Sequence, residues 1–118
     1  MNTFIWILQG VAALIFLMAG MMKATTPYEK LKEKMSWVGD YAAGTVKFIG
    51  LAEILGALGL ILPMALGILP KLTILAAFAL AVIMLLAMRT HFRRKETKEI
   101  LGNVVLLILV LAIALLRY

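Results

Sequence analysis

The chain contains no cysteine, one histidine and six acidic residues among 118. The absence of cysteine excludes disulfide bonds, thiolate catalysis, iron–sulfur ligation and cysteine-based zinc sites. With one histidine per chain, bis-histidine haem ligation would need a dimer. The sequence also shows no phosphate-binding loop, dinucleotide fingerprint or zinc motif. No cofactor and no metal site is therefore evident.

Apolar residues, in contrast, are abundant. They make up 64% of the chain, and the mean hydropathy is +1.06, whereas soluble domains are about half apolar. A chain this short cannot hide such an excess in its own core, because small domains have a high surface-to-volume ratio. We therefore expect residues 1–118 to form a single domain whose outer surface contacts the lipid bilayer.

Four apolar runs divide the chain. They cover approximately residues 4–22, 48–69, 72–88 and 100–116. A helix needs about 17–25 residues to cross a bilayer, and the runs lack the alternation of a membrane barrel. The predicted fold class is therefore all-α, an integral membrane bundle of four transmembrane helices. The first run lacks a preceding basic segment, so we expect it to be retained. Pro63 and Pro70 predict a short turn between antiparallel second and third helices.

The segment between the first two runs has a different pattern. Thr26, Pro27 and Glu29 resemble an N-cap, a first helical residue and a capping-box glutamate. The apolar residues that follow at helical spacing are Tyr28, Leu31, Met35 and Val38. These features predict a short cytoplasmic amphipathic helix that anchors at the membrane interface. A helix that docks a partner protein is the alternative.

The basic residues indicate how the chain crosses the membrane. Ten of the 12 Lys and Arg residues lie in the loops after the first and third runs, and two lie on the opposite side. By the positive-inside rule, these loops face the cytoplasm and both termini lie outside it. The net charge of +6 is thus interpreted as membrane topology and affinity for anionic lipid, and no nucleic-acid partner is expected.

Glu53 is the first candidate functional residue. An acidic side chain in the middle of a membrane helix costs about 2.5–3.5 kcal/mol on insertion scales, so such residues usually face the bundle interior. Glu53 either belongs to a functional site or pairs with a lysine or arginine to fix helix packing. Gly50, Gly56 and Gly59 lie on or beside its face of the predicted helix, and we expect them to allow close helix packing.

Lys23, His91 and Asn103 complete the candidate site. With Glu53, they give each predicted helix one polar residue near its cytoplasmic end. Such convergence favours a ligand-binding or functional polar cluster, although no catalytic role follows from these residue types. Gln9 lies toward the opposite face, where we expect an interhelical hydrogen bond separate from this cluster.

These motifs together resemble the DoxX-like family of small four-helix bacterial membrane proteins. The resemblance is carried by Trp6-Ile7-Leu8-Gln9, Gly20-Met21-Met22-Lys23 with Pro27, the pattern from Gly50 through Glu53, Gly56 and Gly59 to Leu60 with Pro63, and His91-Phe92-Arg93-Arg94 with Asn103. It implies a location in the bacterial inner membrane. Relatives are linked to quinone-coupled sulfur oxidation, membrane redox complexes and assembly of other membrane proteins. Lys23, Glu53 and His91 match recurring polar positions, while thiol-handling branches need cysteines that this chain lacks.

Three functional hypotheses follow. The favoured one is a non-catalytic accessory or assembly subunit that binds a partner protein, a lipid or a hydrophobic small molecule near the polar cluster. Its partners would be the bilayer and either another membrane protein or a second copy of the chain. The alternative is a quinone-binding component of a membrane redox complex, with Trp37 and Tyr28 lining the entrance. The second alternative is a small proton-coupled exporter that depends on Glu53.

Overall fold

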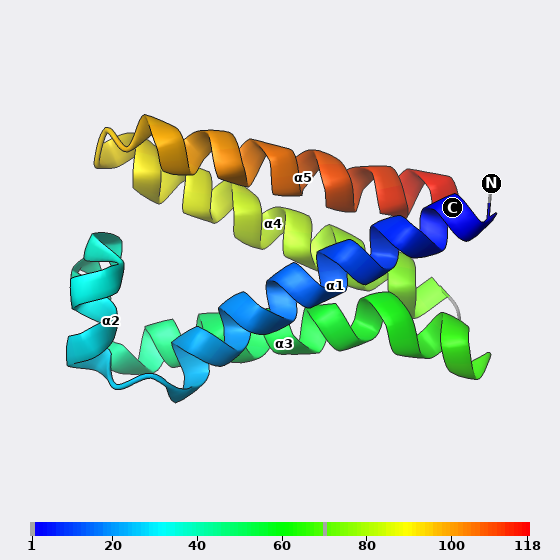
Figure 1. Cartoon of the computed structure of the whole chain (residues 1–118), viewed down its shortest axis with the longest axis horizontal. Coiled ribbons are helices and arrows are strands. Elements are labelled where there is room, and N and C mark those ends of the chain that lie inside the picture. The colour runs from blue at the N-terminus through cyan, green and yellow to red at the C-terminus, as the bar shows by residue number, and fades with distance from the viewer. Residues whose placement is uncertain (1, 70) are drawn as a thin grey trace.

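The computed structural model describes residues 2–69 and 71–118, and the fold in these ranges is entirely helical (Figure 1). In chain order its elements are α1 (Asn2–Thr25), α2 (Tyr28–Lys34), the 3₁₀ helix η1 (Ser36–Asp40), α3 (Ala43–Leu66), α4 (Lys71–Arg93) and α5 (Thr97–Arg117). Four of them, α1, α3, α4 and α5, are long and apolar enough to cross a membrane. The predicted all-α membrane bundle and its additional short helix are thereby confirmed.

The transmembrane helices are mostly longer than the apolar runs that predicted them. Three of the runs, 4–22, 72–88 and 100–116, lie wholly inside α1, α4 and α5. A helix satisfies its own backbone hydrogen bonds, so it continues into polar flanking residues where apolarity no longer marks it.

The second run differs, because α3 ends at Leu66 and the prediction extended it to residue 69. Gly67 ends the helix in the left-handed conformation, with φ of 68°, and the Ile68 N–H donates to the Pro63 carbonyl over 3.0 Å. This glycine-capped end is a common helix terminus. Pro63 itself lies within α3, and Pro70 lies outside the described residues.

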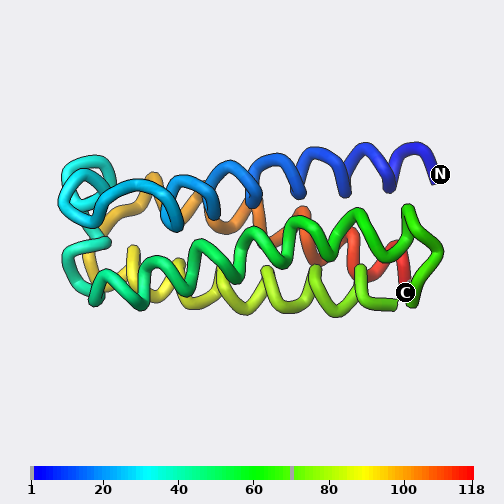
Figure 2. The backbone as a smooth tube through the Cα atoms, turned by 90° about the horizontal axis from the view of Figure 1, so that it is seen from below, coloured from blue at the N-terminus to red at the C-terminus, as the bar shows by residue number. Residues whose placement is uncertain are grey.

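Each long helix packs mainly on one neighbour. α1 packs on α3, α4 packs on α5, and α3 joins the two pairs through its contact with α4. The pairs separate toward the end that carries α2, where Figure 1 shows α1 and α5 far apart. Figure 2 shows the four long helices running side by side along the length of the bundle. We call the end formed by residues 26–42 and 94–96 the basic end.

The interior is filled by apolar side chains from all four long helices. Phe16, Leu60, Leu80 and Ile113 are each 0% exposed and belong to one continuous apolar cluster. Large apolar side chains also cover the outside of the bundle, as Leu115 does with 72% of its surface exposed. The outer surface is thus suited to contact with lipid.

Glycines lie where the long helices come closest. A Cβ atom on Gly20 would lie 2.6 Å from the Gly50 carbonyl oxygen, and one on Gly50 would lie 2.7 Å from the Gly20 carbonyl oxygen. Between α3 and α4, a Cβ on Gly56 would lie 2.6 Å from the Leu80 side chain, and one on Gly59 would lie 2.7 Å from the Ala76 Cβ. These positions leave no room for a side chain without displacement of a neighbour.

The start of α2 corrects the predicted capping box. Helix α2 begins at Tyr28 with Pro27 as its N-cap, and no side chain caps it. The Pro27 carbonyl accepts the first helical hydrogen bond, from the Leu31 N–H over 3.0 Å. The Glu29 carboxylate pairs instead with Lys32, 3.2 Å away. Thr26 therefore precedes the helix without capping it.

The predicted amphipathic face continues across a break in the helix. Met35 adopts an extended conformation with φ of −132°, which ends α2 and lets η1 begin at Ser36. Leu31 and Val38, on either side of this break, are nevertheless both buried and pack with Val46 of α3. After the break, η1 places Trp37 against Lys23 of α1 and His91 of α4.

Candidate functional site

Lys23 and Glu53 form an ion pair between α1 and α3. The Lys23 Nζ atom lies 2.6 Å from the Glu53 Oε1 atom, and the Glu53 side chain is only 1% exposed. The close approach of Gly20 and Gly50 brings the two helices near enough for this contact. Helical side chains lean toward the N-terminus, so Lys23 reaches back along α1 to the level of Glu53. Lys23 thereby neutralises a carboxylate that water barely reaches.

Trp37 of η1 covers this ion pair from the basic end. The Lys23 Nζ atom lies 5.6 Å from the centre of the Trp37 ring, within cation–π distance. The same indole packs edge to face against Tyr41 at 5.8 Å and against His91 at 6.3 Å between ring centres. The Trp37 ring therefore connects the lysine of α1 with the histidine of α4.

His91 is buried, and its hydrogen-bond partner is Glu96 instead of Glu53. The His91 Nδ1 atom donates to the Glu96 carboxylate over 2.9 Å, and the Ser36 hydroxyl donates to the same carboxylate over 3.2 Å. The hydrogen bond from His91 is the largest influence that lowers the pKa of Glu96 below its ordinary value. Glu96 was not among the predicted site residues, although it follows His91 by only five residues.

Three contacts join η1 and its flanking residue to the other side of the bundle. Besides Ser36 with Glu96, the Arg94 guanidinium pairs with Asp40 over 2.8 Å, and the Tyr41 and Thr90 hydroxyls lie 2.5 Å apart. We call residues 36–41 the strap. Because the two helix pairs diverge here, the strap closes the space between them.

Acidification is expected to loosen the strap through Glu96, which faces His91, Arg94 and Ser36. Its pKa is lowered in the folded state, so the unfolded state binds more protons, and the stabilisation is lost as pH falls through the lowered pKa. Hydrogen exchange of residues 36–41, corrected for intrinsic rates, should therefore accelerate below about pH 4. Glu96→Gln should reduce this response, leaving the part that comes from Asp40, and Glu99→Gln should keep it in full. Equal acid responses in all three proteins would contradict the assignment.

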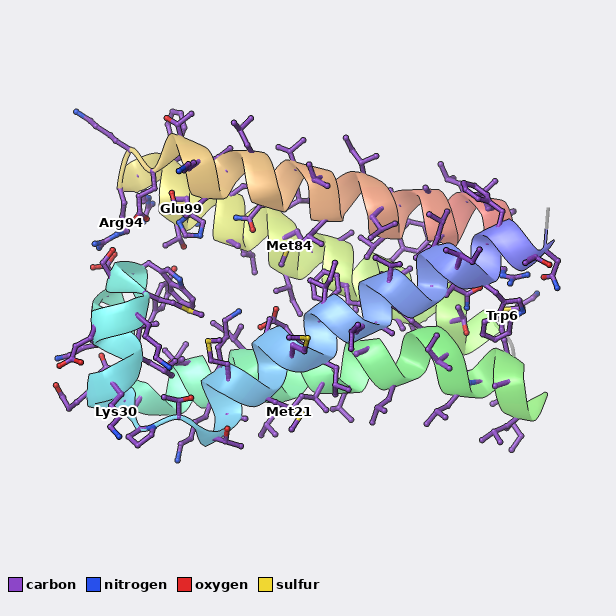
Figure 3. All side chains as sticks on the ribbon, in the orientation of Figure 1. Trp6, Met21, Lys30, Met84, Arg94 and Glu99 are labelled. Carbon is purple, nitrogen blue, oxygen red and sulfur yellow. The ribbon has the colours of Figure 1, made fainter. Side chains whose placement is uncertain are left out.

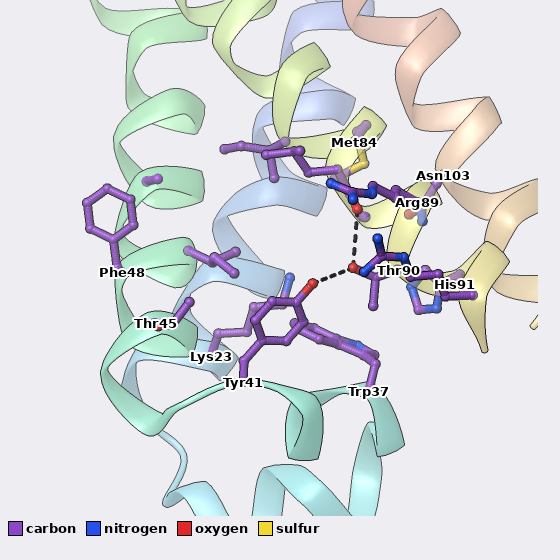
Figure 4. Close-up of a pocket in the computed structure, with 16 residues that line it drawn as sticks. Lys23, Trp37, Tyr41, Thr45, Phe48, Met84, Arg89, Thr90, His91 and Asn103 are labelled. Atoms are coloured by element: carbon purple, nitrogen blue, oxygen red, sulfur yellow. Dashed lines mark hydrogen bonds between the residues drawn. The ribbon is translucent and has the colours of Figure 1, made fainter.

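A cavity of about 410 Å³ lies above the strap, between α3 and α4 (Figure 4). Its apolar wall includes Phe48, Ile49, Ala52, Ile83, Met84 and Leu86. Its polar wall includes Lys23, Tyr41, Thr90, His91 and Asn103. Three of the four residues of the predicted cluster thus line one cavity, while Glu53 is not a lining residue. Tyr41 and Thr90 were not predicted, because the turn after η1 brings Tyr41 to Thr90 of α4.

Asn103 supplies a hydrogen-bond donor without a partner. Its Nδ2 atom is buried and makes no hydrogen bond. A second hollow, of about 640 Å³, lies on the α5 side and shares Lys23, Trp37, His91 and Asn103 with the cavity. These four side chains therefore separate two neighbouring hollows, and the second is also lined by Glu96.

The quinone hypothesis expected Tyr28 to line the cavity entrance, but Tyr28 is not among the residues that line the cavity. Its hydroxyl donates to the backbone carbonyls of Tyr41 and Val38, over 2.5 and 3.3 Å. The tyrosine is thus used to hold the strap against α2. Trp37, the other residue of that hypothesis, does line the cavity.

A separate polar group lies at the opposite end of the bundle. Gln9, which is fully buried, donates to the Leu60 carbonyl over 2.5 Å and accepts from Arg117 over 2.7 Å. The expected interhelical hydrogen bond of Gln9 is confirmed. Figure 3 shows Trp6, whose ring contacts Arg117, and Arg94, which pairs with Asp40 of the strap, at opposite ends of the bundle.

Comparison with known proteins identifies a family. A model described as the DoxX-like family matches residues 7–113 of the 118-residue chain. No curated protein and no solved structure matches. Within residues 2–69 and 71–118, no group of three or more His, Cys, Asp or Glu side chains is placed to hold a metal ion.

Proposed function

The chain belongs to the DoxX-like family, and from that premise we propose that this multi-pass membrane protein is a non-catalytic accessory subunit that binds a small amphiphile in its cavity. The amphiphile is a lipid or another hydrophobic molecule with a polar head. The observation that carries the proposal is the cavity between α3 and α4. We place the chain in the bacterial inner membrane with its two basic loops in the cytoplasm, as the positive-inside rule predicts. In this topology the polar wall of the cavity lies on the cytoplasmic side.

The dimensions and chemistry of the cavity support this function. Small-molecule sites are usually apolar hollows of about 300–1,000 Å³ with a few convergent polar groups. This one has about 410 Å³, with an apolar wall formed by side chains of α3 and α4 and with polar side chains gathered near the strap. Such an arrangement fits a molecule with an apolar body and one polar end.

The polar wall favours a hydrogen-bond acceptor. An ammonium group carries three donors, and Lys23 gives one of them to Glu53. Asn103 offers a buried donor with no partner, and an unmatched buried donor costs about 1–3 kcal/mol. A carbonyl, carboxylate or phosphate oxygen would satisfy both residues. In this proposal Glu53 is a positioning residue, because it holds the lysine from behind the cavity wall.

A quinone is the second candidate, favoured by the unpartnered donor of Asn103. Lys23 and Asn103 would donate to its carbonyl oxygens, and the group would supply two-electron redox chemistry when bound. His91 and Glu96 would then provide a hydrogen-bonded link between the cavity wall and the 22% exposed carboxylate of Glu96. The exporter alternative needs a Glu53 carboxylate that can exchange protons with water. Glu53 is 1% exposed and paired with Lys23, so its position does not support this alternative.

Tryptophan fluorescence tests the binding function, because the chain has two tryptophans and only Trp37 lines the cavity. In Trp6→Phe protein in phosphatidylcholine nanodiscs, a dibrominated stearyl alcohol or a short-chain ubiquinone should quench Trp37 saturably. Trp37→Phe protein reports from Trp6 beside Arg117 and should show only unsaturable quenching. Asn103→Leu should weaken binding about five- to tenfold. Identical, unsaturable quenching of both tryptophans would contradict the site.

A further inference from the structure

We propose that the cavity selects an amphiphile with an anionic head, a carboxylate or a phosphate ester, which reaches it from the bilayer between α3 and α4. The inference rests on the proposed function and adds the charge of the ligand and its route. It is carried by the unequal distribution of charged side chains around the two neighbouring hollows.

The charged groups that line the cavity are all basic. They are Lys23, Arg89 and Arg93, and no carboxylate is among the lining residues. Lys23 is already neutralised by Glu53 at 2.6 Å. The positive charge left for a ligand therefore belongs to the two arginines of α4.

The two arginines are placed to share one anion. Arg89 and Arg93 are four residues apart on α4, so they lie on the same face of the helix. Both are exposed, and neither makes an ion pair within residues 2–69 and 71–118. Two like charges at this spacing repel each other. A guanidinium group can donate two parallel hydrogen bonds to the oxygens of one carboxylate or phosphate. A single anionic head bound by both arginines would therefore relieve the repulsion between them.

The lipid-facing side of the cavity indicates the route. Phe48 of α3 is 71% exposed and Leu86 of α4 is 58% exposed, and both line the cavity from within helices long and apolar enough to span the membrane. A lipid tail can therefore leave the cavity between these helices, while its head stays near the strap. Figure 4 shows this side, with α3 and α4 on either side of the cavity and Trp37 and Tyr41 below it.

The second hollow has a mixed charge, with carboxylates that the cavity lacks. Glu96 and Glu99 line it, and Lys34 is its basic residue besides those it shares with the cavity. Glu96 is paired with Arg94 and His91, whereas Glu99 makes no ion pair within residues 2–69 and 71–118. Glu99 would therefore disfavour an anionic head that approached past α5. The charge distribution thus assigns the anionic ligand to the α3–α4 side.

The test compares ligands that differ only in head charge. The protein is the Trp6→Phe variant in phosphatidylcholine nanodiscs at mildly alkaline pH. Half-maximal quenching of Trp37 should need an about tenfold lower mole fraction of dibrominated stearic acid in the bilayer than of the matching alcohol. The Arg89→Gln/Arg93→Gln double variant should lose this preference and still bind the alcohol, which also shows that it folds. Lys95→Gln/Lys98→Gln, which removes the same charge outside the cavity lining, should keep the preference.

The outcomes separate the inference from the proposed function. Equal quenching by acid and alcohol would overturn the inference and leave amphiphile binding intact, whereas saturable quenching by neither would overturn both. A preference for brominated phosphatidylglycerol over brominated phosphatidylcholine would support a phospholipid as the source, and a preference confined to the free acid would support a fatty acid. Displacement of the acid by inorganic phosphate alone would overturn a bilayer source.

Discussion

Replacement of Lys23 by methionine is expected to lower the free energy of unfolding by about 3–5 kcal/mol, because it leaves an unpaired buried carboxylate. Glu53 is 1% exposed, and Lys23 is its hydrogen-bond partner over 2.6 Å. Methionine keeps most of the apolar length of lysine, so the loss reports the charge. Unfolding of purified protein in mixed detergent micelles, titrated with sodium dodecyl sulfate, measures the effect.

A double-mutant cycle provides the control for this prediction. Glu53→Leu alone should also destabilise, because it leaves the lysine ammonium without its partner, but Lys23→Met/Glu53→Leu should be less destabilised than the sum of the single changes. Lys47→Met, at an exposed lysine of α3, the helix that carries Glu53, should have little effect. Additive losses in the cycle would mean that the ion pair makes no specific contribution.

Gly50→Ala is expected to destabilise the protein by about 3 kcal/mol, at the upper end of the range for overpacking. The new methyl group would meet the Gly20 carbonyl oxygen at 2.7 Å and the Ala24 backbone nitrogen at 2.9 Å. Both are backbone atoms, so α1 must move as a whole to accommodate it. The same detergent unfolding measurement reports the loss, and ligand binding should weaken because the movement displaces Lys23.

The matched control lies on the same helix. Gly44 is also in α3, and a Cβ added to it would have no atom within 4 Å. Gly44→Ala should therefore be neutral or slightly stabilising, since alanine favours helix more than glycine does by up to about 1 kcal/mol. If the two substitutions had equal effects, the close approach of α1 and α3 at Gly50 would be wrong.

The parts of the fold that depend on local pattern could be predicted from the sequence. The apolar runs located all four long helices, because lipid demands apolar side chains along a whole span. The predicted helix ends were wrong where the conformation of a single residue ends a helix. The left-handed Gly67 stops α3 three residues early, and the extended Met35 divides the predicted amphipathic helix. Neither backbone conformation can be predicted from the hydropathy of the sequence.

The candidate site was predictable only in its components. A polar residue near the end of each helix suggested one cluster, but the structure divides it. Lys23 forms an ion pair with Glu53, whereas His91 forms a hydrogen bond with Glu96 in the turn before α5. Partner choice among polar side chains depends on helix rotation and on loops, which a single sequence does not encode as a periodic pattern. Tyr41 of the strap and Thr90 of α4, 49 positions apart, could not be paired for the same reason.

The pairing of Lys23 with Glu53 bears on how the protein is made. Both residues belong to the first two long helices, α1 and α3, which leave the ribosome before α4 and α5. A nascent hairpin of these helices would carry lysine and glutamate into the bilayer as a neutral pair, avoiding the insertion penalty of a lone acidic side chain. The later hairpin would then dock beside an already assembled half. The ligand cavity would be the seam between the halves, closed last when the strap meets the turn between α4 and α5.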